Sequence, residues 1–138
     1  MLLIDGNGLP LGCTISTASR NDVRLIESLI DQRTLRRKIK RLIYDKAADS
    51  DPLRSRLKKR GIDLICPHQR GRKKKPTQDG RKLRRYRKRW KVERTIAWLH
   101  NFRRIVTRYE YHDYIYHSFV KIACIVICLL YTSPSPRD

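Results

Sequence analysis

Residues 41–67 read RLIYDKAADSDPLRSRLKKRGIDLICP, and this stretch decides the fold. The apolar run RLIYD predicts a short buried strand that ends at Asp45. DSDPLRSRLKKRG predicts a short helix, with Asp51 as its cap, Pro52 in its first turn and Gly61 at its end. IDLICP predicts a second buried strand. A strand, a helix and a strand in this order are typical of an α/β fold.

The chain before this stretch predicts a hairpin and a helix. Residues 1–17 hold two apolar runs around a tight turn, for which Gly6, Asn7 and Gly8 would supply positive φ angles. Residues 19–32 carry apolar side chains at helical spacing. Added to the strands around Asp45, these elements predict one mixed sheet that is flanked by helices.

The chain after this stretch is strongly basic and then helical. Residues 70–91 hold thirteen Lys or Arg among 22 residues, and we expect a mobile loop over about 70–82 that phosphate contact orders. A helical pattern runs from Leu83 to Glu110, and a largely apolar helix over 114–128 should pack against the sheet. The expected buried positions of the first pattern are Leu83, Trp90, Val92, Ile96, Leu99 and Val106.

The net charge points to an anionic polymer as the partner. The 138 residues include 33 Lys or Arg against 13 Asp or Glu, which gives a formal charge of +20. Such an excess favours nucleic acid, because each neutralised phosphate releases counterions and adds affinity. A solvated basic face and a ribosome-associated protein are the alternative interpretations.

The cysteines and apolar segments favour a cytoplasmic protein. The four cysteines form no CxxC pair, so buried free thiols in a reducing cytosol are expected instead of zinc ligands or disulfides. The first residues, MLLIDGNGLP, do not have the pattern of a signal peptide. The apolar stretch IACIVICLLY is about half of the ~20 residues that a spanning helix needs, so no membrane role is expected.

Two acidic residues are candidates for chemistry. Asp45 is expected at the carboxyl end of a buried strand, where α/β sites usually lie, or else as a simple cap of the following turn. Glu93 lies among cations on a helix, where Arg89 at i−4 would keep it ionised; a surface ion pair is the alternative. Carboxylates are the ligands that Mg²⁺ prefers. Asp49 and Asp51 are interpreted as turn and helix-cap residues.

Aromatic residues lie among the basic ones. Tyr86, Trp90 and Tyr109 could stack on unpaired bases, whereas core packing is expected for Trp98. The histidines show neither ligand spacing nor a nucleophile nearby; they are His68, His100, His112 and His117.

Three ordered segments resemble the DDE transposases of bacterial insertion sequences, in particular the group numbered five. These segments are LIDGNGLPLG, DKAADSDPLRSRLKKRGI and RRYRKRWKVERTIAWLHNFRRIVTRYE. The third contains most of the helix signature Y-x2-R-x3-E-x6-K, with Tyr86, Arg89 and Glu93 in place and His100 where the family has Lys.

The resemblance implies an RNase H-like catalytic domain and a triad of acids that binds two Mg²⁺ or Mn²⁺ ions. Asp45 matches the second acid and Glu93 the third. The first acid would lie upstream of the hairpin, so Asp5 does not match it. Ala48 replaces the family's usual Tyr.

The resemblance also implies DNA as the partner, in a bacterial cytoplasm and close to the nucleoid, with a homodimer as the assembly of the intact protein. The residues expected to contact DNA are Tyr86, Arg89, His100, Lys73, Lys74, Lys75, Arg84, Arg85, Lys88, Arg103 and Arg104.

Both ends of the sequence are expected to depart from a complete domain. Residues 1–127 would be a partial catalytic domain without its first strand, and residues 128–138, CLLYTSPSPRD, resemble a translated sequencing adapter. The expected function is therefore that of a transposase fragment that binds DNA but lacks full activity. A non-enzymatic basic nucleic-acid-binding module and an RNase H-like nuclease are the alternatives.

Overall fold

The computed structural model describes residues 1–16, 22–34, 37–73 and 75–132. The chain divides into two compact units. The first unit comprises Met1–Ser19, Ser28–Leu35 and Lys91–Asp138, and the second comprises Arg20–Glu27 and Arg36–Trp90. Each unit is described by itself.

A β-hairpin opens the first unit. Strand β1 (Leu2–Ile4) pairs antiparallel with β2 (Pro10–Cys13), as the sequence predicts. Among the described residues only Gly8 of the turn has a positive φ, of 98°, so the expectation for Gly6 and Asn7 is wrong. The Asp5 carboxylate shapes the turn instead, because Oδ1 accepts hydrogen bonds from the backbone N–H groups of Asn7 and Leu9, both at 2.8 Å.

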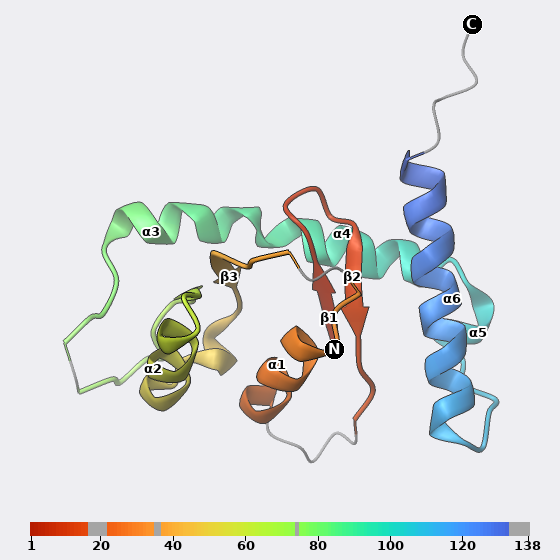
Figure 1. The fold of residues 1–138 in the computed structure, drawn as a ribbon, viewed down its shortest axis with the longest axis horizontal. Helices are drawn as coiled ribbons and strands as arrows, with labels where there is room; N and C mark the ends of the chain where they lie inside the picture. Colours follow the sequence, from red (N-terminus) through yellow and green to blue (C-terminus); the bar gives the residue numbers. More distant parts are fainter. Residues whose placement is uncertain (17–21, 35–36, 74, 133–138) are drawn as a thin grey trace, which may run out of the picture. The chain divides into compact units, whose positions relative to one another are not determined.

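Three helices complete the first unit: α4 (Trp90–Leu99), α5 (Arg103–Val106) and α6 (Asp113–Thr132). Helix α6, drawn in blue in Figure 1, packs against β2, which confirms the expected packing of the last helix. The described core of this unit joins the hairpin, α4 and α6 through Cys13, Leu99, Ala123, Cys124 and Ile127. Trp98 packs against this core, which confirms the role expected of it.

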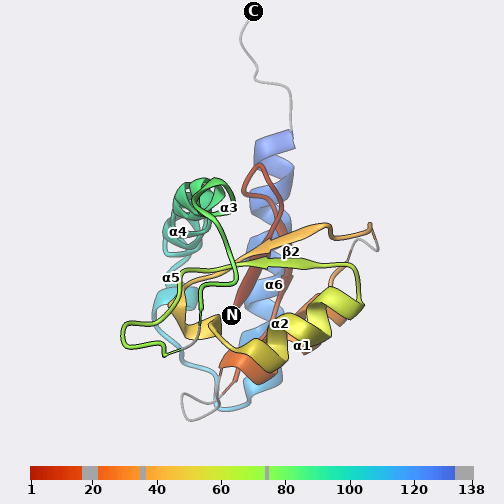
Figure 2. The same ribbon diagram turned by 90° about the vertical axis from the view of Figure 1, so that its left-hand side faces the viewer.

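The second unit is built on a strand–helix–strand arrangement. Strands β3 (Arg41–Ile43) and β4 (Asp63–Ile65) are parallel, and Figure 2 shows them side by side. A 3₁₀ turn, η1 (Lys46–Ala48), and helix α2 (Asp51–Lys59) connect them. Leu53 and Leu57, both fully buried, lie on one face of α2 and form the centre of the core.

Helix α2 begins and ends close to where the sequence predicts, but its capping residue is one position earlier than expected. Ser50 caps the helix, because its hydroxyl accepts a hydrogen bond from the N–H of Leu53, and Asp51 is the first helical residue instead of the cap. A Ser cap leaves Pro52 in the first turn, where its missing N–H costs no bond. Gly61 ends the helix with a φ of 74°, as predicted.

Helix α1 (Asp22–Asp31) is present where its apolar spacing predicts it. Its residues Ile26, Leu29 and Ile30 are buried. The α/β order of elements is therefore confirmed. The described strands, however, form two separate two-stranded ladders instead of the single sheet that we expected. Strands of three or four residues have few backbone N–H and C=O groups with which to pair. The described strands pair within their own unit.

The helical pattern predicted from Leu83 is divided into several pieces. Asp79 caps α3 (Gly80–Arg84), which starts three residues early and passes into a 3₁₀ segment, η2 (Arg85–Arg89), before α4. A 3₁₀ segment turns every three residues, so the side chains after it point to a face that a regular α-helical period does not predict. Of the six expected buried positions Leu99 alone is buried, while Trp90, Ile96 and Val106 are exposed and Leu83 and Val92 are half-buried.

Helix α6 is longer than the apolar stretch considered in the sequence. A window of 19 residues, Asp113–Tyr131, has a mean hydropathy of 1.8, so length and composition would allow it to cross a membrane. The length argument against a membrane helix is therefore wrong. A core helix of a soluble protein passes the same test, and the absence of a membrane partner stays a prediction. The helix includes residues 128–132 of the expected non-native tail, whose remaining residues lie outside those described.

Candidate functional site

Asp45 lies two residues beyond the end of β3, in the second unit. The N–H of Tyr44 still bonds to the carbonyl of Ile65, so the parallel pairing continues almost to Asp45. Its Oδ1 accepts a hydrogen bond of 2.8 Å from the N–H of Ala47 and thereby caps η1. Asp45 therefore follows a parallel strand and caps the next turn, while its role in catalysis stays a prediction.

Asp49 is the centre of a cluster that sequence reasoning missed. Its side chain is 2% exposed, and its Oδ1 lies 2.8 Å from Arg54 Nη2, 2.9 Å from His68 Nδ1 and 3.4 Å from Arg72 Nη1. Oδ2 accepts a hydrogen bond from the N–H of Gln69. Burial raises the pKa of Asp49, but the hydrogen bonds from Arg54, Gln69 and His68 outweigh it and hold the pKa at about 2.

The Asp49 cluster fastens the beginning of the basic segment to the turn after Asp45. Arg72 also pairs with Asp51 at 2.7 Å, and the N–H of Thr77 donates to His68 Nε2 at 3.1 Å. The side chain of Gln78 donates to the carbonyl of Cys66 at 2.7 Å. Arg72, Thr77 and Gln78 of the basic segment are thus held by contacts within the protein, while the ordering of the loop by phosphate stays a prediction.

No periodic pattern marks this cluster in the sequence. Arg54 is five residues from Asp49, whereas His68 and Arg72 follow at separations of 19 and 23. The available signal lies in the composition: an acid in a strongly basic chain has many potential cationic partners.

Glu93 lies in the first turn of α4, in the first unit, and its side chain is exposed. The helix is anchored on the hairpin turn by three neighbouring side chains. Lys91 donates to the carbonyl of Gly6, Arg94 Nη2 to that of Asn7 at 2.8 Å, and Thr95 Oγ1 to that of Gly8 at 2.7 Å. The two residues of each contact are 85 to 87 positions apart in the sequence. They fix the turn of α4 that carries Glu93, while the ion pair expected with Arg89 stays a prediction.

Gly8 allows the closest of these contacts. A Cβ atom on it would stand 2.8 Å from Arg94 Nη2, and its φ of 98° disfavours any other residue. Thr95 is fully buried, and the single proton of its hydroxyl is shared between the carbonyl of Gly8 and that of Lys91, 2.9 Å away.

We expect Thr95→Val to lower the free energy of unfolding by about 1–2 kcal/mol, because valine keeps the shape but leaves the buried Gly8 carbonyl without its donor. Urea denaturation followed by circular dichroism measures this change. Thr107→Val is the matched control, since Thr107 is exposed and should change stability by less than about 0.5 kcal/mol. Equal effects of the two substitutions would rule out the anchoring role of Thr95.

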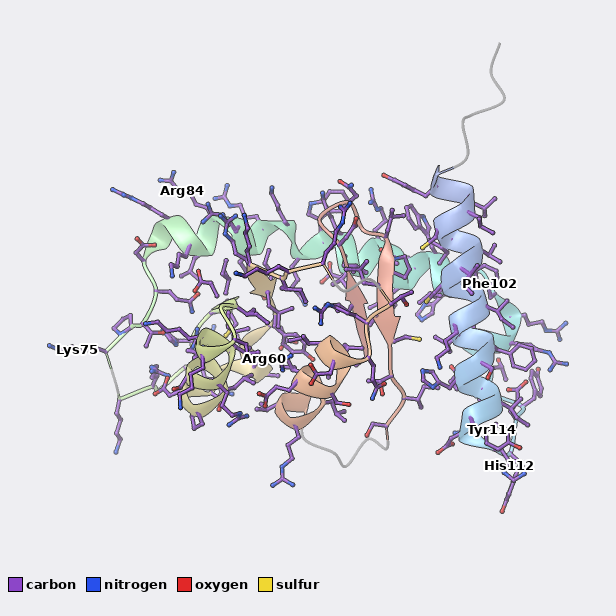
Figure 3. The ribbon with its side chains drawn as sticks, in the orientation of Figure 1. Arg60, Lys75, Arg84, Phe102, His112 and Tyr114 are labelled. Atoms are coloured by element: carbon purple, nitrogen blue, oxygen red, sulfur yellow. The ribbon has the colours of Figure 1, made fainter. Side chains whose placement is uncertain are left out.

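Most residues predicted to contact DNA have exposed side chains: Lys73, Lys75, Arg84, Arg85, Lys88, His100, Arg103 and Arg104. Figure 3 shows Lys75 and Arg84 extending away from the ribbon. Arg84, Arg85 and Lys88 make no ion pair within the described residues of the second unit. Their exposed side chains place positive charge on α3 and η2, and phosphate binding by these residues stays a prediction. Lys74 lies outside the described residues.

Other predicted contacts already have partners inside the protein. Arg89 lies over the ring of Tyr86, 5.7 Å from its centroid, and both are half-buried. In the first unit, Arg104 pairs with Glu110 at 3.0 Å and lies 5.1 Å from the ring centroid of Phe119. Such contacts hold a guanidinium in place, which is compatible with binding an anion at its remaining N–H groups.

The carboxylates of Asp45, in the second unit, and of Glu93, in the first, are each of the ligand type that a hard divalent cation prefers. Asp45 is half-buried, and its hydrogen bond from the N–H of Ala47 uses one of its two carboxylate oxygens. Asp49 does not fit this role, because its Oδ1 is taken by Arg54 and His68 and its Oδ2 accepts from the N–H of Gln69. Over residues 1–16, 22–34, 37–73 and 75–132, no three His, Cys, Asp or Glu side chains gather as a metal cage. Mg²⁺ is commonly held by one or two carboxylates together with water and substrate phosphates, so DNA could complete the ligand set.

Comparison with known proteins gives consistent matches. A family described as "Transposase DDE domain" matches residues 1–129. The chain is 36% identical over 135 residues to a protein of Burkholderia cepacia named "Putative transposase for insertion sequence element IS402". The match covers 92% of this chain and 60% of that relative, so the chain spans well under two thirds of the relative's length. No solved structure matches. The extent of the family match and the identity to this relative lead to one conclusion: the chain belongs to the DDE transposase family of bacterial insertion sequences.

Proposed function

We propose that this chain carries part of the catalytic centre of an enzyme that cuts and joins DNA at the ends of an insertion sequence. The observation that carries the proposal is the position of Asp45, an acid at the carboxyl end of the parallel strand β3. The Asp49 cluster holds the chain immediately after it. A rigid backbone and a fixed neighbouring turn are what a metal-binding carboxylate needs.

Asp45 and Glu93 would hold Mg²⁺ or Mn²⁺, and such ions supply an activated water and stabilise the leaving oxygen during phosphoryl transfer. The hairpin contacts of Lys91, Arg94 and Thr95 set the direction of Glu93 on α4. The exposed cations of α3 and η2 would hold the DNA backbone through its phosphates. An RNase H-like arrangement of the intact domain belongs to the same proposal.

The spacing of Tyr86, Arg89 and Glu93 supports the insertion-sequence group numbered five. We further propose a cytoplasmic protein that works on DNA close to the nucleoid, without a membrane partner, and that forms a homodimer when intact. The partial catalytic domain and the non-native tail over residues 128–138 also stay proposals.

Binding of Mn²⁺ to the purified chain tests the role of the two acids. We expect Asp45→Asn and Glu93→Gln each to weaken Mn²⁺ binding about tenfold or more, because each removes an anionic ligand. Electron paramagnetic resonance of free Mn²⁺ measures the affinity. Asp63→Asn is the matched control, since Asp63 is a half-exposed acid at the start of β4 that pairs with Lys82.

The proposal fails if Asp45→Asn and Glu93→Gln bind Mn²⁺ as tightly as the unchanged chain does. In that case a non-enzymatic basic module would explain the chain better, with both acids serving in caps and ion pairs alone.

A further inference from the structure

Cys13 and Cys124 meet in the core of the first unit. Cys13 ends β2, Cys124 lies on α6, and the two buried thiols belong to one core cluster. The Sγ of Cys13 also lies 3.6 Å from Nε2 of His117. The same Nε2 lies 2.9 Å from the carbonyl oxygen of Cys13. His117, Lys121 and Cys124 follow one another at spacings of four and three residues, so they share one face of α6.

The surroundings lower the pKa of the Cys13 thiol and raise that of the Cys124 thiol. The hydrogen bond from Cys124 lowers the pKa of Cys13 most; burial opposes it, and His117 and Lys121 lower it further. The same hydrogen bond and burial raise the pKa of Cys124, so this sulfur keeps its proton. Burial raises the pKa of Cys66 and that of Cys128 as well. Cys13 is thus the strongest nucleophile among the four.

We propose that Cys13 and Cys124 are a peroxide-sensitive pair, in which Cys13 is the attacking sulfur and Cys124 the resolving one. Each keeps 9% of its surface exposed, and hydrogen peroxide is small enough to reach a sulfur at such an opening. The adjacent imidazole and ammonium groups provide the positive surroundings in which oxidation-sensitive cysteines are found.

The chemistry balances in two steps. The Cys13 thiolate attacks one oxygen of hydrogen peroxide; the O–O bond breaks, hydroxide leaves and takes up the proton that the Cys13 thiol had released to solvent, and Cys13 becomes a sulfenic acid. The sulfur of Cys124 then attacks that of Cys13; the S–O bond breaks, an S–S bond forms, and the leaving hydroxide takes the Cys124 proton as water. Two thiols are oxidised, one peroxide is reduced, and two waters form.

The product would join β2 covalently to α6. The hairpin that contains β2 is also the element that Lys91, Arg94 and Thr95 grip from α4. Oxidation would therefore tie together the three elements that form the core of this unit.

Treatment of the whole purified chain with hydrogen peroxide, followed by intact mass and peptide mapping, tests the proposal. We expect the loss of two hydrogen atoms in mass and a peptide that links Cys13 to Cys124. Cys124→Ser should stop the reaction at a sulfenic acid on Cys13, which dimedone traps. His117→Ala should slow the first step about tenfold, as the thiolate fraction falls.

Cys66→Ser is the matched control, because Cys66 is a buried thiol of the other unit and its loss should leave the reaction unchanged. Cys128→Ser should also leave it unchanged. A link between Cys124 and Cys128, links between chains alone, or oxidation of Cys13 no faster than of Cys66 would each overturn the proposal. Circular dichroism of every variant separates these outcomes from a loss of folding.

Discussion

Asp49→Ala is expected to lower the free energy of unfolding of the second unit by about 3–5 kcal/mol, because it leaves the buried guanidinium of Arg54 without its anion. The side chain of Arg54 is 12% exposed and lies 2.8 Å from Asp49, whereas Arg72, 13% exposed, keeps its ion pair with Asp51 at 2.7 Å. The substitution also takes the acceptor from the N–H of Gln69. Urea denaturation followed by circular dichroism measures the loss.

The dependence of this loss on pH identifies its cause. The pKa of Asp49 is held at about 2 in the folded chain, below the ordinary value of 3.8 for an aspartate. A carboxyl with a lowered pKa stabilises the fold above its unfolded pKa, and this contribution disappears as the pH falls through the folded value. The difference in stability between the unchanged chain and Asp49→Asn should therefore shrink between about pH 4 and pH 2.

Asp63→Asn serves as the control for Asp49, since its ion pair with Lys82 is 42% exposed on both sides and should contribute less than about 1 kcal/mol. A loss at Asp49 no larger than that at Asp63, or one that is constant down to pH 2, would contradict the ion-pair account.

The triple variant Arg84→Ala, Arg85→Ala and Lys88→Ala should lower DNA affinity about 10²–10³-fold at moderate salt, since three phosphate contacts are removed. The slope of log affinity against log salt should become shallower by about three, because each contact releases about 0.9 counterion. Fluorescence anisotropy with a short duplex at several salt concentrations measures both quantities.

A second triple variant separates local contact from overall charge. Lys38→Ala, Lys58→Ala and Lys59→Ala remove the same charge from exposed positions of the same unit. We expect a much smaller loss of affinity and a slope close to that of the unchanged chain. Equal losses in the two triple variants would mean that DNA binding depends on net charge and not on α3 and η2.

The sequence predicts the second unit well where the signals are local. Apolar runs define β3 and β4, while Pro52 and Gly61 mark the two ends of α2. The position of Asp45 after a strand follows from the same signals. Each of these features depends on neighbours within a few residues, which is what periodicity and capping report.

The parts that could not be predicted depend on distant partners. Nothing near Asp49 in the sequence announces that Arg54, His68 and Arg72 will surround it. The 3₁₀ segment η2 has no breaker residue, so the helical spacing before and after it misplaces the buried face. The sequence correctly predicts that Glu93 lies on a helix. It does not predict the hydrogen bonds between α4 and the hairpin, because their acceptors are backbone carbonyls, which have no sequence signature.

The hydrogen bonds from α4 to the hairpin turn affect which substitutions this part of the chain can accept. The acceptors are main-chain oxygens of Gly6, Asn7 and Gly8, which every residue type possesses. Replacements on the hairpin side cannot compensate for a lost donor on α4, so the two sides of the contact have no reason to covary. Gly6 has open space around it and should accept many side chains, whereas Gly8 should accept almost none. In related sequences we therefore expect the donor residues on α4 to be conserved. In the hairpin turn that they contact, we expect conservation at Gly8 alone.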